Sequence, residues 1–279
     1  MKITQKLGIS YISTKIKLLS LLSKKKAAEK AFEIFCTPFV KSKRKEHPKN
    51  ATPVSFKINN VTIYGHRWNH PQPKKILLLH GFSSAAHKFD RYVNPLIKKG
   101  YEVLSFDAPA HGHSEGATTN ALEYSQAIEK IVTLYGPIQS FIAHSFGGIG
   151  LSLAMENITH DAATKIVFIA PATETTSAID GALAMLKINS PAIRKEFDNI
   201  ILKKSGKPTE WFSVRRALKN ITAQILWLHD EDDDITPLND ALKVKGDNHN
   251  NINFVITKGL GHRKIYHDAT VKKAILNFL

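Results

Sequence analysis

From residue 74 to residue 257 the chain alternates short apolar runs with longer stretches of helical spacing. The apolar runs are KKILLLH, YEVLSFD, QSFIAH, KIVFIAP, AQILWLH and INFVIT. Continuous apolar runs of this length are typical of strands covered on both faces. Two of the intervening stretches end at helix stop signals, Gly100 and the pair Gly136–Pro137. The alternation predicts an α/β domain with a mostly parallel sheet and helices on both faces.

A polar, Pro-containing segment at residues 46–53 separates this pattern from the N-terminal part of the chain. Immediately after it, VSFKINNVTIYGHRW reads as two short strands joined by Asn59 and Asn60, a pair that tolerates the positive φ of a tight hairpin. We therefore expect a main domain over residues 51–279 and a separate helical extension over residues 1–50. A chain of 279 residues can bury a sizeable core.

The alternation is interrupted at residues 172–217, where a long and mainly helical stretch replaces the usual short connection. Loops at the carboxyl ends of parallel strands are where active sites gather, and an insertion there can serve as a lid. The stretch is a candidate cap of the main domain.

The N-terminal extension carries most of the excess positive charge. Residues 1–50 hold thirteen Lys and Arg against three Asp and Glu, with dense patches at residues 24–26 and 41–45. Such patches can attract anionic lipid or nucleic acid, but a solvated helix face is the simpler interpretation of them. No interleaved aromatics or zinc-finger spacing accompany them, so we expect no nucleic-acid partner.

Residues 9–23, ISYISTKIKLLSLLS, are the one stretch that suggests a signal or membrane segment. Two lysines interrupt it, it is too short to span a bilayer, and no small-residue cleavage site follows it. It reads as an amphipathic helix that packs on the domain or lies on a membrane surface, with an apolar side of Ile9, Ile12, Ile16 and Leu19. The single cysteine, Cys36, fits a reducing compartment. We expect a cytoplasmic protein, with the inner membrane surface as the alternative.

The sequence AHSFGG, residues 143–148, joins an apolar strand-like run to an expected helix. A nucleophilic serine needs its hydroxyl exposed on a sharp turn and a backbone N–H aimed at the developing oxyanion, and small flanking residues permit such a turn. Ser145 with Gly147 meets this requirement. Ala143 departs from it, because the G-x-S-x-G pattern has glycine there.

A serine hydroxyl requires a general base, and the base requires an acidic partner. The loop LHDEDDDITP after a strand offers Asp230, Asp232, Asp233 and Asp234 as acids. For the carboxylates of this loop that do not partner the base, we expect a solvated position. His262 in KGLGHRK is the candidate base, because it follows a strand on a glycine-containing loop. Other histidines near strand ends lack metal-ligand spacing, and no EF-hand pattern is present, so we expect neither a metal nor a cofactor.

Two further loops lie at the same expected edge of the sheet. In HGFSS, Gly81 allows the backbone of Phe82 to turn its N–H inward as an oxyanion donor. The loop DAPAHGHSEG contains Asp107 and His111, for which a structural role in a tight turn is the simpler interpretation.

Together, HGF at 80–82, DAPAHGHSEG at 107–116, HSFGG at 144–148, the acidic loop and GLGH at 259–262 resemble the α/β-hydrolase superfamily, within it a bacterial esterase-like subgroup with a basic N-terminal extension. The resemblance implies an eight-stranded sheet, a helical cap after the sixth strand, a triad of Ser145, Asp233 and His262, and oxyanion amides at Phe82 and Phe146. Asp230 departs from the pattern, since glycine is usual there. Residues 1–50 lie outside the resemblance.

The function implied is that of a carboxylesterase-like serine hydrolase that cleaves a small-molecule ester or thioester of small to medium acyl chain. An Asp in place of Ser145 would have indicated a dehalogenase or an epoxide hydrolase. Hydroxynitrile lyases keep the serine, so this activity is one alternative. The others are a non-catalytic ligand-binding or signalling module and a membrane-associated lipase or lysophospholipase. The sequence does not indicate an oligomeric state.

Overall fold

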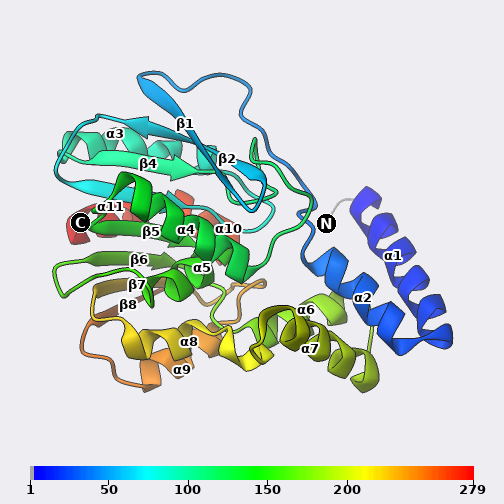
Figure 1. Cartoon of the computed structure of the whole chain (residues 1–279). Coiled ribbons are helices and arrows are strands. Elements are labelled where there is room, and N and C mark those ends of the chain that lie inside the picture. The colour runs from blue at the N-terminus through cyan, green and yellow to red at the C-terminus, as the bar shows by residue number, and fades with distance from the viewer. Residues whose placement is uncertain (1–2) are drawn as a thin grey trace. The chain divides into compact units, whose positions relative to one another are not determined.

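The sheet of the computed structural model has eight strands in the order β1-β2-β4-β3-β5-β6-β7-β8 (Figure 1). The structure describes residues 3–279, with side chains from residue 8 onward. The hairpin strands β1 and β2, and β2 with β4, are antiparallel, whereas every other neighbouring pair is parallel. The expected eight-stranded, mostly parallel sheet is confirmed. The strands are β1 (Ala51–Ile58), β2 (Val61–Trp68), β3 (Lys75–Leu79), β4 (Glu102–Phe106), β5 (Ser140–His144), β6 (Lys165–Ile169), β7 (Gln224–Asp230) and β8 (Ile252–Thr257).

The helices fall close to the stretches that the sequence predicts. Asn59 and Asn60 form the hairpin turn with φ of 48° and 63°, as expected from the pair. The helical stretch that was expected to end at Gly100 begins as a 3₁₀ turn, Ala86–Phe89, and continues as α3. The α-helices are α1 (Ile3–Leu22), α2 (Lys24–Phe35), α3 (Asp90–Lys98), α4 (Ala121–Tyr135), α5 (Phe146–Met155), α6 (Thr175–Met185), α7 (Pro191–Ser205), α8 (Val214–Ala217), α9 (Leu238–Gly246), α10 (Gly261–Lys264) and α11 (Ala269–Phe278).

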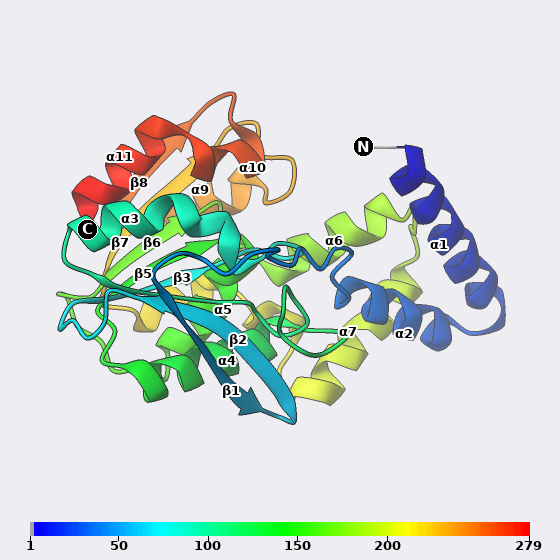
Figure 2. The same cartoon turned by 90° about the horizontal axis from the view of Figure 1, so that it is seen from above.

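Helices cover both faces of the sheet (Figure 2). On one face, α3 and α11 share a buried core with the strands, which includes Tyr92, Leu96 and Ile275. On the other face α4 packs against α5, where Gly150 lets Tyr124 approach the α5 backbone closely. Burial on both faces explains why the central strands read as unbroken apolar runs.

The parallel register sets where the chemistry can lie. Leu79 at the end of β3 pairs with Ala143 of β5, and Ala143 pairs in turn with Phe168 of β6. The segments that follow these strands therefore leave the sheet at one edge. In parallel α/β sheets the carboxyl edge is where ligand sites form.

The chain divides into two compact units. One unit, residues 38–173 and 213–279, contains the whole sheet. The other contains the described residues up to Thr37 together with Glu174–Phe212, and is entirely helical: α1, α2, α6 and α7.

The helical unit has its own aromatic core between α2 and α7. Phe32 and Phe35 of α2 place their ring edges on Phe197 of α7, with centroid separations of 5.3 and 5.6 Å. The hydroxyl of Ser13 in α1 donates to the carbonyl of Leu186, just beyond α6, at 2.5 Å. Within this unit the N-terminal extension and the helices inserted after β6 thus share one core, an association that the sequence alone did not indicate.

Candidate active site

Ser145 occupies the turn between β5 and α5 with φ of 54° and ψ of −118°. Such a conformation is strained for any residue but glycine, and surrounding contacts must hold it. The N–H of Ser145 donates to the carbonyl of Ile169 at 3.1 Å, while its own carbonyl accepts from Gly148 at 2.8 Å and Ala172 at 3.0 Å. Backbone bonds to two neighbouring segments therefore fix the turn that exposes the hydroxyl.

The small residues around this turn are required by close backbone packing. A Cβ on Gly147 would lie 2.7 Å from the carbonyl oxygen of Leu79, and one on Gly148 would lie 2.5 Å from the Cβ of Pro171. Ala143 departs from the G-x-S-x-G pattern without disturbing the turn. It is fully buried within β5, where its extended backbone does not require glycine.

The structure brings Ser145, His262 and Asp233 together. The Nε2 atom of His262 lies 3.0 Å from the Oγ of Ser145, and its Nδ1 lies 2.8 Å from an Oδ of Asp233. All three side chains are buried or nearly so and belong to the sheet-containing unit. The arrangement corresponds to a hydroxyl that donates to Nε2 and an Nδ1–H that donates to the carboxylate, as nucleophile–base–acid sets require. His262 lies on the short helix α10, directly after the glycine loop.

Asp233 is held as a carboxylate by its own loop. One oxygen accepts from the backbone N–H groups of Ile235 and Thr236 at 2.9 and 2.8 Å, and the other accepts from the Thr236 hydroxyl at 2.8 Å as well as from His262. Burial acts to raise the pKa of Asp233, but these hydrogen bonds and the charge of His262 outweigh it, so the pKa is lowered. A carboxylate that stays ionised can orient the imidazole and stabilise its protonated form.

We had expected the carboxylates of the acidic loop other than Asp233 to be solvated. Asp230 is not. Its side chain is fully buried at the end of β7. One oxygen accepts from the N–H groups of Asp232 and Gly261 at 3.0 and 2.8 Å, and the other accepts from the Thr257 hydroxyl at 2.6 Å and the Leu260 N–H at 3.1 Å. Burial opposes ionisation, but these donors lower the pKa of Asp230 overall. The carboxylate thereby ties down the loop that carries His262.

His144, the residue before the serine, holds the same loop from the other side. Its Nε2 lies 3.1 Å from the backbone carbonyl of His262, and its ring packs on the rings of His262 and Tyr266 at centroid separations of 4.7 and 4.6 Å. Burial lowers the pKa of His144 to about 3, so the ring is neutral and Nε2–H donates. Sequence reasoning offered Asp230 only as one of four candidate acids and gave His144 no place in the site.

The Phe82 turn after β3 and the first turn of α5 flank Ser145. Within residues 3–279, no hydrogen bond uses the backbone N–H of Phe82 or Phe146, and Phe146 is the first residue of α5, where helix N–H groups lack helical partners. A Cβ on Gly81 would lie 3.0 Å from the Cβ of Ser145, so the turn approaches the serine closely. The two phenylalanine rings pack edge to face at 5.3 Å and are half-buried.

Two buried histidines brace this turn. The Nε2 of His111 accepts from the N–H of Ser83 at 2.9 Å, and the Nε2 of His80 accepts from the N–H of Ala108 at 2.9 Å. In both rings Nδ1 is left to donate to a backbone carbonyl, at 2.8 to 2.9 Å. Burial lowers the pKa of His80 to about 4 and that of His111 to about 3, so both are neutral scaffold groups.

Asp107 has a similar bracing role, in agreement with the interpretation of its loop as structural. Its two oxygens accept from the backbone N–H groups of Ala86 and His113, at 2.8 and 2.9 Å.

No group of three His, Cys, Asp or Glu residues in the described part of the chain is arranged to hold a metal ion.

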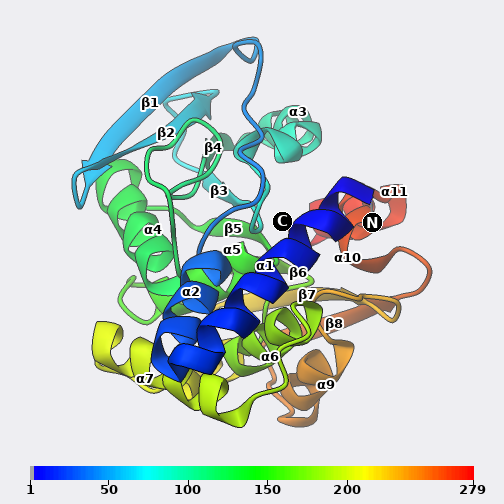
Figure 3. The same cartoon turned by 90° about the vertical axis from the view of Figure 1, so that its right-hand side faces the viewer.

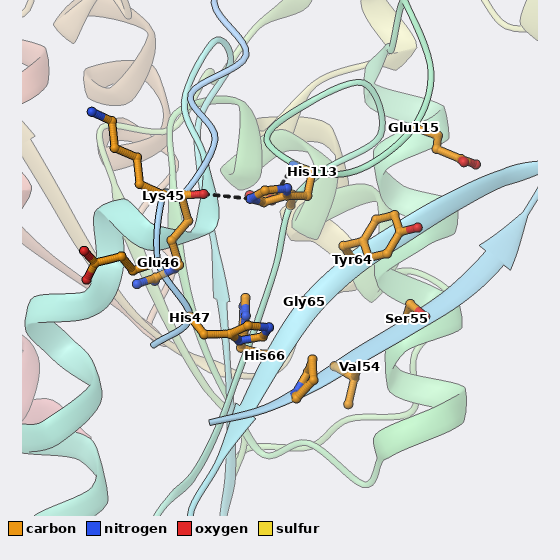
Figure 4. A pocket seen from close by; sticks show the side chains of 13 residues that line it. Lys45, Glu46, His47, Val54, Ser55, Tyr64, Gly65, His66, His113 and Glu115 are labelled. Carbon is orange, nitrogen blue, oxygen red and sulfur yellow. Dashed lines mark hydrogen bonds between the residues drawn. The ribbon is translucent and has the colours of Figure 1, made fainter. Parts of the chain in front are cut away.

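A separate pocket of about 770 Å³ lies along the β1–β2 hairpin, between residues 44–47 and the loop after β4 (Figure 4). His47 and His66 face each other in it with ring centroids 5.4 Å apart. Burial, with the nearby charge of Arg44, lowers the pKa of His66 to about 4. The residues that line the pocket include no serine paired with a base, so the chemistry assigned to Ser145 has no counterpart there.

The geometry agrees with the comparisons to known proteins. A model of the alpha/beta hydrolase family matches residues 76–213, which include the β3 turn and the Ser145 turn. The eight-stranded, mostly parallel sheet agrees with the fold of that family. The chain belongs to the α/β-hydrolase superfamily. The family expected from the motifs is thereby confirmed.

Individual relatives of this α/β hydrolase are distant. The uncharacterized hydrolase YugF of Bacillus subtilis is 29% identical over 106 residues, a match that spans 36% of this chain and 38% of that protein. A structure of the Pyrococcus furiosus esterase Pf2001 superposes with a TM-score of 0.66 at 17% identity, covering 88% of this chain and 97% of that one. The thioesterase domain from the curacin biosynthetic pathway gives a TM-score of 0.57 at 14% identity, covering 81% and 98%. At these identities the structural likeness establishes the fold.

Proposed function

We propose that this α/β hydrolase is a serine hydrolase that cleaves a carboxylic ester or thioester through an acyl-enzyme intermediate. The observation that carries the proposal is the pair of contacts of His262, 3.0 Å from the Ser145 hydroxyl and 2.8 Å from the Asp233 carboxylate. Distances of this size allow proton transfer from the hydroxyl to the imidazole without rearrangement. The strained turn at Ser145 supports the assignment, because strain of this kind concentrates at functional sites.

In the proposed reaction the Ser145 oxygen attacks the carbonyl carbon while Nε2 of His262 takes its proton. Asp233 orients the imidazole and stabilises its positive charge, and the N–H groups of Phe82 and Phe146 bind the oxyanion. Collapse of the tetrahedral intermediate expels the alcohol or thiol, which takes the proton from His262. In the second half of the reaction His262 takes a proton from water, and the water oxygen attacks the carbonyl carbon of the acyl enzyme. The intermediate then collapses, which releases the carboxylic acid, and His262 returns the proton to Ser145.

The aromatic side chains beside the serine favour an uncharged acyl group as the part of the substrate bound next to Ser145. Phe82 and Phe146 pack on each other, and Phe146 also packs on Tyr124 at 5.3 Å. Apolar walls with a few convergent polar groups are typical of small-molecule sites. The esterase and the thioesterase domain among the structural relatives are consistent with both leaving-group classes.

The test is hydrolysis of p-nitrophenyl esters and acyl thioesters of increasing chain length by the full-length protein. Ser145→Ala should lower kcat/KM by roughly 10⁴-fold or more, and Asp233→Asn by about 10³–10⁴-fold. Asp234→Asn is the matched control, since Asp234 is exposed on the same loop. Turnover that survives Ser145→Ala would refute the mechanism, and a folded protein that turns over no ester would favour the non-catalytic binding module.

A further inference from the structure

Helix α1 has two apolar faces, and only one of them is packed. Ile16 is fully buried and Ile12 and Leu19 are half-buried, on the side that the sequence predicts to be apolar. The opposite side is also apolar: Tyr11, Leu18 and Leu22, at spacings of seven and four residues, are 71, 60 and 85% exposed. Leu21, beside them, is 81% exposed. From residue 8 onward, the simple amphipathic interpretation of this helix therefore accounts for half of its apolar side chains.

The exposed face is unusual for a helix on the surface of a compact unit, where the outward side is normally polar. Grouped exposed apolar side chains, in contrast to scattered ones, mark contact sites for a partner or a membrane. Figure 3 shows α1 at the outside of the helical unit, with α2 beside it. No helix among residues 3–279 is long and apolar enough to cross a bilayer, so any membrane contact of this face would be with the surface.

The charged side chains of α1 and of the first turn of α2 are all positive. Exposed Lys15 and Lys17 lie on the same helix, and Lys24–Lys26 follow at the start of α2. The first acidic residue of the chain is Glu29. No ion pair in the described part of the chain involves any of these five lysines. The face thus combines apolar side chains with free positive charge.

We infer that the outward face of α1, defined by Tyr11, Leu18, Leu21 and Leu22 with the lysines beside it, docks on an anionic lipid bilayer. An interfacial helix buries an apolar stripe among the acyl chains while lysines contact the headgroups. A second copy of the chain on the same face would bring the lysines of one α1 against those of the other, and α1 itself has no acidic residue to compensate. The inference does not depend on catalysis at Ser145.

The test is co-sedimentation of the full-length protein with vesicles of phosphatidylcholine alone or of equal parts phosphatidylcholine and phosphatidylglycerol. The wild type should bind the anionic vesicles more strongly than the neutral ones. Its binding to the anionic vesicles should weaken as the salt concentration increases. The double variant Leu18→Ser/Leu22→Ser should bind roughly 100-fold more weakly, at about tenfold for each leucine removed from the acyl region. Lys15→Gln/Lys17→Gln should bind roughly 25-fold more weakly, at about fivefold for each lysine.

The matched controls are Leu202→Ser and Lys195→Gln/Lys203→Gln on α7, which remove exposed side chains of the same kinds from the same unit. They should bind as the wild type does. Equal binding to both vesicle types, or full binding by the leucine variant, would overturn the inference. So would a wild type that binds neither vesicle but forms dimers in light scattering that the leucine variant abolishes, since the face would then serve a second copy.

Discussion

Asp230→Asn tests whether a buried carboxylate holds the loop that carries His262. The substitution preserves size and one accepting oxygen but replaces the other with an NH₂ group. If the amide keeps the bonds from Asp232 and Gly261, it loses those from the Thr257 hydroxyl and the Leu260 N–H, both within 3.1 Å. Hydrogen bonds to a charged acceptor contribute about 1.5–3 kcal/mol each, so the loss of two should lower the free energy of unfolding by about 3–6 kcal/mol.

A loss of this size should lower the midpoint of thermal unfolding by roughly 10 °C, followed by circular dichroism. Because the weakened loop positions His262, the rate of Ser145 acylation should fall as well, without a comparable change in KM. The matched control is Asp234→Asn on the exposed part of the same loop. A midpoint for Asp230→Asn within a degree or two of the control would refute the argument, because four buried bonds to one carboxylate could not then be supporting the loop.

Three other predictions follow from the same structure. His144→Phe retains a ring beside Tyr266 but loses the donor to the His262 carbonyl, so kcat measured on an activated ester should fall about tenfold or more while the fold persists. Burial lowers the pKa of His80, His111 and His144 from 6.5 to about 4, 3 and 3. As pH falls, these histidines are therefore protonated in the unfolded chain at a higher pH than in the folded one. Stability measured by urea unfolding should therefore decrease from about pH 6.5 toward pH 4, by up to about 1.4 kcal/mol per pH unit for each histidine; a flat profile would contradict this. Gly147→Ala would place a Cβ 2.7 and 2.9 Å from two backbone carbonyls, so it should abolish ester turnover and destabilise the fold, whereas Gly181→Ala, with open space at its Cβ, should do neither.

The sheet could be predicted because its local signals and its tertiary environment agree. Strands buried on both faces must be continuously apolar, and the breaks at Gly100 and Gly136 end the helices between them. The composition of the helical unit could not be predicted. Its contacts join residues more than 150 positions apart, such as Phe32 and Phe197, and hydrophobic spacing within each helix does not identify the partner.

The candidate site, like the fold, could be predicted only in part from the sequence. Ser145 and His262 lie in short motifs whose glycines indicate sharp turns, so position and residue type together selected them. Asp233 could be separated from its neighbours only by resemblance to a family, since four aspartates in five positions look alike in sequence. Asp230 was assigned to solvent because burial of a carboxylate depends on donors from the loop after β8. Its one signal was the departure from the glycine usual at that position.

The central claim is that Ser145 is an activated nucleophile. The most direct measurement is labelling of the full-length protein with a fluorophosphonate probe, beside Ser145→Ala, with the modified residue located by mass spectrometry. We predict one labelled residue, Ser145, and no labelling of the variant. A folded wild type that is not labelled, or a label that persists in Ser145→Ala, would contradict the account.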